Sequence, residues 1–81
     1  MSTVQKIIDY DIAIEVIAEV RANAGRRKLA AASEEDRQSA IDTIKVCNIE
    51  ENILNTPGME DAKLSVYDKV FNYYVPMLKE S

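Results

Sequence analysis

The acidic side chains near the N-terminus are the first residues whose spacing could serve chemistry. Asp11, Glu15 and Glu19 follow one another at intervals of four residues, so a helix would place their carboxylates in one row. Such a row could ligate a divalent cation if other chains supplied further ligands, but the sequence has no calcium-loop pattern and no Glu-x-x-His pair. We therefore interpret this acidic stripe as a solvated helix face and a candidate protein interface, and we predict no metal and no cofactor.

A second cluster is basic. Arg21, Arg26, Arg27 and Lys28 hold four of the ten positive charges within eight positions, around an Asn-Ala-Gly sequence. Guanidinium groups beside a flexible turn could converge on a phosphate or a carboxylate. Cations also favour a helix C-terminus for purely local reasons, and the chain's two glycines stand alone, without a phosphate-loop motif. Both interpretations of this basic cluster, an anion-binding site and a capped helix end, remain open.

The chain lacks the commonest catalytic groups. It contains no histidine, which removes the usual general base and the usual metal ligand. Its one cysteine, Cys47, cannot form an internal disulfide and is expected to be a small buried hydrophobe. We predict that the protein is not an enzyme. Among the aromatic residues of the C-terminal part, Tyr73 points away from the face that the others share, so it is a candidate interface residue.

The first long apolar segment, residues 4–20, is the one around which the fold should be organised. At helical periodicity its apolar side chains form an arc of roughly two-thirds of a turn, wider than a surface helix needs, so the helix should be covered on more than one side. Ser2 or Thr3 would cap it, and Asn23 or Gly25 would end it. The alternative is an α+β fold, because residues Ile12–Val20 also alternate as a strand does.

Two further helices are expected after this segment. Ser33 and three acids begin the second, which should run from about Glu34 to Leu54, with Glu50 and Glu51 outside its core face or at the margin. An Asn-Thr-Pro-Gly turn at residues 55–58 precedes a third helix that starts near Met59 or Glu60. Pro76 should end or kink that helix near Tyr74, leaving residues 79–81 as a frayed tail. The prediction is a single all-α domain over residues 1–81, a small three-helix bundle, packed as a compact monomer or an intertwined homo-oligomer.

Composition limits the function classes. The chain has 81 residues, 47% of them hydrophobic, and a net charge of −4. An acidic balance argues against general nucleic-acid binding and against binding to anionic membranes. No apolar run approaches the length of a bilayer span, and no signal peptide is evident. Together with the lone cysteine, these features predict a cytoplasmic protein.

Two functional hypotheses follow. The first is a non-enzymatic interaction protein, a small acidic helical inhibitor, adaptor or other regulator that associates with itself and binds another protein. Small acidic helical proteins without histidine occur among bacterial and phage regulators, which is an analogy of composition. The second is a small-molecule binder that holds an anionic, nucleotide-like ligand with Arg26, Arg27 and Lys28 at a subunit interface.

Overall fold

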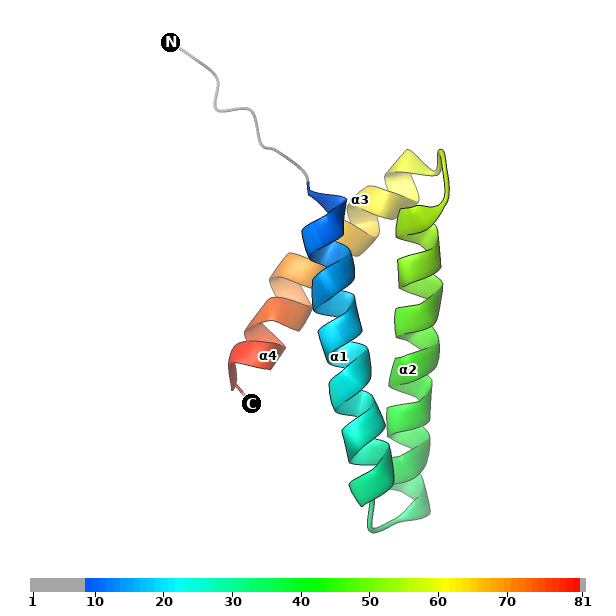
Figure 1. Cartoon of the computed structure of the whole chain (residues 1–81), viewed down its shortest axis with the longest axis vertical. Coiled ribbons are helices and arrows are strands. Elements are labelled where there is room, and N and C mark those ends of the chain that lie inside the picture. Colours follow the sequence, from blue (N-terminus) through cyan, green and yellow to red (C-terminus); the bar gives the residue numbers. More distant parts are fainter. Residues whose placement is uncertain (1–8, 81) are drawn as a thin grey trace.

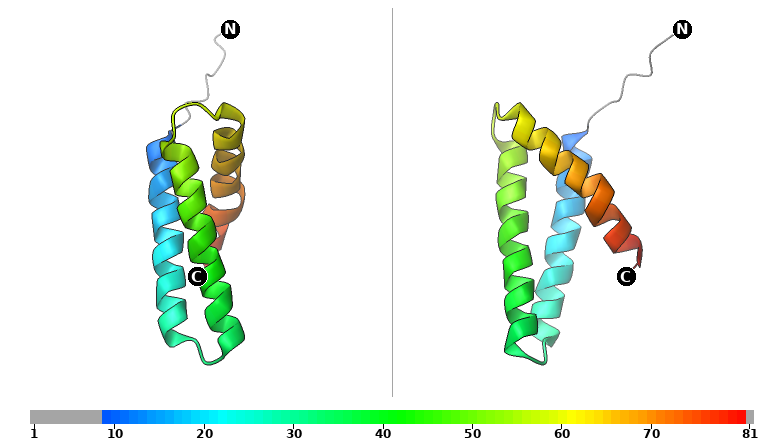
Figure 2. Two further views of the ribbon diagram at one scale, coloured as in Figure 1. Left: turned by 90° about the vertical axis from the view of Figure 1, so that its right-hand side faces the viewer. Right: turned by 180° about the vertical axis from the view of Figure 1, so that it is seen from behind.

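The computed structural model, which describes residues 9–80, shows an all-α fold of three helical rods (Figure 1). Helices α1 (Tyr10–Ala30) and α2 (Glu34–Asn55) form a long antiparallel hairpin. The third rod consists of α3 (Glu60–Lys69), a π-helical turn η1 (Val70–Tyr74) and α4 (Val75–Glu80), and it crosses one face of the hairpin diagonally (Figure 2). No strand occurs within residues 9–80, so the α+β alternative for Ile12–Val20 is wrong.

Helix α1 starts later than the apolar pattern indicated. The Asp9 backbone is extended, and its carboxylate accepts hydrogen bonds from the backbone N–H groups of Asp11 and Ile12 at 3.0 and 3.3 Å. Asp9 is therefore the N-cap, because its oxygen satisfies two of the donors that a helix start leaves unpaired. The predicted cap at Ser2 or Thr3 and the first residues of the predicted helix lie outside the described residues.

The same helix also ends later than predicted. It continues past Asn23 and Gly25 to Ala30, so the prediction that these two residues cap it is wrong. The residues that follow Gly25 are Arg, Lys, Leu and Ala, which are good helix formers. One interior glycine costs about 1 kcal/mol relative to alanine, which a helix paired with a neighbour of equal length can tolerate.

Helix α2 agrees with its local signals. Ser33 caps it by accepting from the Asp36 N–H at 3.1 Å, and three acids occupy its first turn, where the helix dipole favours negative charge. It ends at the predicted turn, where Gly58 adopts φ 80°, a left-handed conformation that suits glycine. Helix α3 then begins at Glu60, as predicted.

Pro76 does not end the third rod, which corrects the prediction of a helix end near Tyr74. The irregularity does occur there: η1 ends at Tyr74, two residues before the proline, and the Val75 N–H donates to the Val70 carbonyl, five residues back. A π turn accommodates one extra residue and so changes which side chains face the hairpin. Residues 79 and 80 belong to α4 and not to a frayed tail.

The core is made where the third rod crosses the hairpin. Its members are the buried apolar side chains of all three rods: Ala13, Ile17, Val20, Cys47, Leu54, Val66, Tyr67, Val70 and Tyr74. The buried stripe of α1 is narrower than the arc predicted from the sequence, because Ile12 is 46% exposed. Val46 and Ile49 of α2 are exposed, whereas Val66 of α3 is buried.

Burial stops abruptly along the hairpin. From Gly25 through Ser39, the segment that includes the hairpin turn, no residue is buried. The third rod explains the difference: α3 packs on α2 and η1 packs on α1, whereas α4 runs on beyond α1 (Figure 2). We call the part of the hairpin that lies under α3 and η1 the proximal half. The part toward the hairpin turn, which includes residues 25–39, is the distal half.

Candidate functional site

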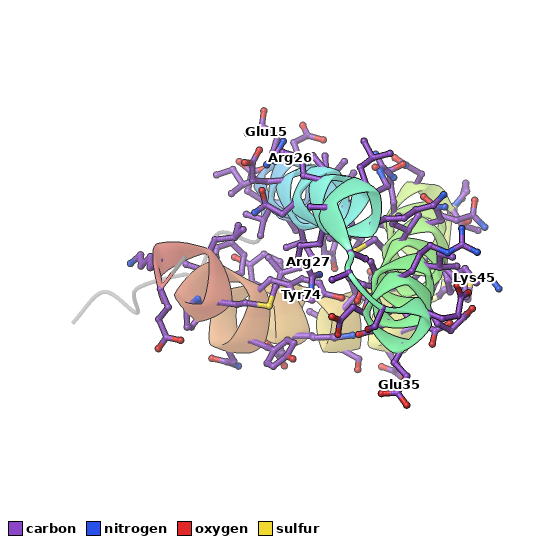
Figure 3. All side chains as sticks on the ribbon, turned by 90° about the horizontal axis from the view of Figure 1, so that it is seen from below. Glu15, Arg26, Arg27, Glu35, Lys45 and Tyr74 are labelled. Atoms are coloured by element: carbon purple, nitrogen blue, oxygen red, sulfur yellow. The ribbon has the colours of Figure 1, made fainter. Side chains whose placement is uncertain are left out.

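An open groove lies beside the distal half. It has a volume of about 660 Å³. Its sides come from α2 and from the third rod, and Arg27 of α1 lies between them. Figure 3 shows Arg27 and Tyr74 in the space enclosed by α1, α2 and α4. The groove has the following lining residues: Arg27, Glu35, Gln38, Ser39, Asp42, Thr43, Val46, Lys69, Tyr73, Tyr74 and Met77.

The two sides of the groove carry opposite charges. The carboxylates, Glu35 and Asp42, stand on α2, while the cations are Arg27 of α1 and Lys69 at the end of α3. Among residues 9–80, none of the salt bridges involves Arg27, Glu35 or Asp42. Between these charges lie apolar and aromatic side chains, of which Val46 is 39% exposed and Tyr73 is 58% exposed. The groove thus has an amphipathic surface with charges of both signs.

Hollows flank helix α4 on both sides. A second hollow, also of about 660 Å³, separates it from α1 and is lined by Val20, Arg26 and Leu78 among others. Met77 and Arg27 line both hollows. No residue of α4 is buried, although Val75, Met77 and Leu78 pack partly against the core. This short helix therefore presents apolar side chains that its own chain covers incompletely.

A buried polar cluster closes the proximal end of the groove. Glu50 is only 7% exposed; its Oε1 accepts a short hydrogen bond from the Tyr74 hydroxyl, and its Oε2 lies 2.8 Å from Lys69 Nζ. The Lys69 ammonium also lies 5.0 Å from the centre of the Tyr74 ring, within the range of a cation–π interaction. A buried carboxylate requires such partners, so this cluster fixes η1 onto α2.

The cluster also shifts two proton equilibria. Burial, reinforced by the hydrogen bond and the charge of Glu50, raises the pKa of the Tyr74 hydroxyl far above its ordinary value of 10.0. Burial and the charge of Glu50 raise the pKa of the Cys47 thiol above 9.0. Both groups are therefore protonated at neutral pH. A protonated and fully buried thiol is a poor nucleophile, in keeping with the structural role predicted for Cys47.

The basic cluster does not converge on one point. Arg21 turns to α2, where its guanidinium lies 3.0 Å from Asn48 Oδ1 and 3.2 Å from Glu51 Oε1. Arg26 lies on the other side of α1, hydrogen-bonded to Asn23 and 3.8 Å from Glu19. Only Arg27 reaches the groove, and Lys28 is exposed near the hairpin turn. The structure thus separates Arg21 from the other three candidate anion-binding residues.

The acidic stripe and Tyr73 lie on different surfaces. Asp11, Glu15 and Glu19 are all exposed on α1, and Figure 3 shows Glu15 directed away from the groove. Tyr73 lines the groove from the opposite side of the molecule's core. The four residues selected from the sequence as candidate interface positions therefore belong to two separate surfaces.

Sequence reasoning missed Glu50 and most of the groove. The apolar residues of α2 at positions 40, 47 and 54 recur every seven residues, which requires a core-facing residue near position 50 or 51. Both of these positions are glutamates, and this conflict was the available signal that one carboxylate is buried with a partner. The groove residues of α2 had no such signal, because only the path of the third rod brings them opposite α4.

The described residues form a helical hairpin crossed by a third rod, with a groove beside its distal half. No relative was found that assigns this fold to a family. No protein-family model matches the chain, and neither a curated protein nor a solved structure matches it. Across residues 9–80, no three His, Cys, Asp or Glu side chains form a group that could hold a metal ion. None of the helices in that range is long and apolar enough to cross a membrane. The groove and the charged surfaces of residues 9–80 are therefore the basis of the functional proposals.

Proposed function

We propose that this chain is a non-enzymatic interaction protein that acts by binding another protein through the groove, as a small adaptor or inhibitor does. The observation that carries the proposal is the groove, in which the exposed Tyr73 and Val46 and the half-buried Met77 lie beside charged side chains. Protein interfaces are enriched in Tyr, Met and Arg at their centres and have polar rims. Tyr and Arg also supply much of the binding energy where they are desolvated on association.

The acidic stripe is a second candidate contact. Asp11, Glu15 and Glu19 are exposed together on α1, and they would favour a partner with a basic surface. Exposed charges of this kind mainly accelerate association and make its rate depend on salt. Reversing them should slow the binding of such a partner at low salt and change little at high salt, while unchanged rates at low salt would exclude the stripe from the interface.

An anionic small molecule is the second functional candidate. Arg27 and Lys69 line one groove together with the hydroxyls of Ser39 and Thr43, which is a set of donors that a phosphate could use. The carboxylates on the α2 side of the groove oppose such a ligand. Inorganic phosphate or a nucleotide should raise the melting temperature of the wild type, and not of Arg27→Ala, if this candidate is correct.

A photo-crosslinking experiment tests the protein-binding proposal. A benzoylphenylalanine placed at position 73 should form covalent adducts with a protein when the full chain is expressed in cells of its natural source. The same reagent at position 45 is the matched control, because Lys45 is exposed on α2 and points away from the groove (Figure 3). Adducts at position 73 and not at 45, identified by mass spectrometry, support the proposal. Equal labelling at both positions, or none at either, contradicts it.

A further inference from the structure

We infer that the groove binds a second copy of this chain, in a two-fold homodimer in which the α4 helix of each copy packs into the groove of the other. This inference rests on the proposed function, because it names the partner of the same surface. It is a narrower statement, since the groove could bind a different protein while the chain itself stays monomeric.

The charges of the groove are the first argument. A two-fold contact applies a surface to its own copy, so a surface of one sign repels itself. The chain has a net charge of −4, and its exposed acidic stripe on α1 would oppose self-association. The groove is different, because cations on α1 and α3 face carboxylates on α2. A two-fold rotation can place Arg27 of each copy near the carboxylates of the other.

The state of α4 is the second argument. This six-residue helix has no buried residue, and hollows flank it on both sides. So short a helix gains little from its own hydrogen bonds and depends on packing. Because α4 itself borders the groove, a copy placed over the groove brings the two α4 helices together and covers Met77 and Tyr73 of both chains.

The length of the hairpin is the third argument. An 81-residue chain buries a limited core, yet it builds two helices of 21 and 22 residues. Its third rod covers only the proximal half of them, and residues 25–39 include no buried side chain. A helix from a second copy over the distal half would complete the arrangement of a helical bundle, in which each helix packs on two neighbours.

Light scattering coupled to size-exclusion chromatography tests this inference on the full chain. At about 0.1 mM, enough for a dimer of micromolar Kd, the wild type should have twice the chain mass of 9.1 kDa. Arg27→Glu should leave Lys69 as the one cation among the acidic side chains of the groove, and Asp42→Lys should leave Glu35 as the one carboxylate among its cations. Each variant alone should be largely monomeric, and an equimolar mixture of the two should recover the dimer.

Two matched variants control for net charge. Lys45→Glu changes the charge by as much as Arg27→Glu, and Asp61→Lys by as much as Asp42→Lys. Lys45 points away from the groove (Figure 3), and Asp61 lies in the first turn of α3, outside the groove lining. Both controls should remain dimeric. A monomeric wild type would overturn the inference, as would groove variants that stay dimeric. A monomeric wild type that still forms crosslinks from position 73 to another protein would overturn the dimer alone and leave the proposed function standing.

Discussion

The two halves of the helical hairpin differ in how far their side chains are buried. In the proximal half, Ile17 is fully buried and packs beneath the third rod, whereas Leu29, twelve residues along the same helix, is 88% exposed. The cause is the direction of the third rod, which crosses the hairpin once and leaves the distal half uncovered (Figure 2). The comparison separates a half that holds the fold together from a half that is available for binding.

The buried polar cluster marks the border between these halves. Glu50 binds Tyr74 and Lys69, and these two partners also line the groove. A change at the border should therefore affect both stability and the shape of the groove, whereas a change further along the distal half should affect binding alone.

Truncating one apolar residue in each half should give the largest difference in stability between the halves. Ile17→Ala should destabilise the protein by about 3 kcal/mol, because it removes buried contacts and leaves a cavity. Leu29→Ala should change the free energy of unfolding of the monomer by less than about 0.5 kcal/mol. Urea denaturation of both variants at low protein concentration measures the difference. Equal losses would show that the distal half is packed as the proximal half is.

Removing the border carboxylate should have the next largest effect. Glu50→Ala should cost about 2 kcal/mol, because it leaves the Tyr74 hydroxyl and the Lys69 ammonium without their partner. The loss is moderated by water, since the Lys69 side chain is 39% exposed. Glu51→Ala is the matched control, because it removes a neighbouring carboxylate whose partner, Arg21, is also partly exposed. A larger loss for Glu51→Ala would contradict the role assigned to Glu50.

The raised pKa of Tyr74 predicts that the stability of the protein depends on pH. Tyr74→Phe should cost about 1.5 kcal/mol at neutral pH, the lower end of the range for a hydrogen bond to a charged acceptor. Because folding raises the pKa of Tyr74 and of Cys47, the folded state holds protons that the unfolded state releases at high pH. The stability of the wild type is thus complete below about pH 9 and falls as pH rises through 10 and beyond. The stability of Tyr74→Phe should fall less steeply with pH. Identical slopes for the variant and the wild type would show that Tyr74 does not contribute to the pH dependence.

The smallest expected effect is a gain in stability. Gly25 lies inside α1, and a Cβ built at this position meets no atom within 4 Å. Gly25→Ala should stabilise the monomer by about 0.5–1 kcal/mol through helix propensity alone, which corresponds to a rise of a few degrees in Tm. A loss of stability would show that α1 ends near residue 25, as the sequence had suggested.

Local signals in the sequence predicted the parts of the fold that local chemistry decides. The cap at Ser33, the turn before Gly58 and the start of α3 at Glu60 each depend on a few adjacent residues, and all were predicted. The length of α1 was not, because the cost of one glycine is smaller than the gain from helix formers on either side.

Features that depend on tertiary packing were harder to predict. The burial of Glu50 was indicated only by the gap in the seven-residue pattern of α2. The groove could not be predicted at all, because it depends on the angle at which the third rod crosses the hairpin. Of the candidate residues chosen from the sequence, Arg27 and Tyr73 lie in the groove, Arg26 and Glu19 border the neighbouring hollow, and the others lie elsewhere.

Hydrogen exchange of the wild type at two protein concentrations tests the division between the halves most directly. Raising the concentration across the association midpoint should slow exchange in residues 26–46 and 69–80, which border the groove, while residues 10–20 exchange at the same rate. This result would place self-association on the distal half and leave the proximal core as an independent fold. Protection that appears over residues 10–20 instead, or exchange that does not depend on concentration, would contradict the account.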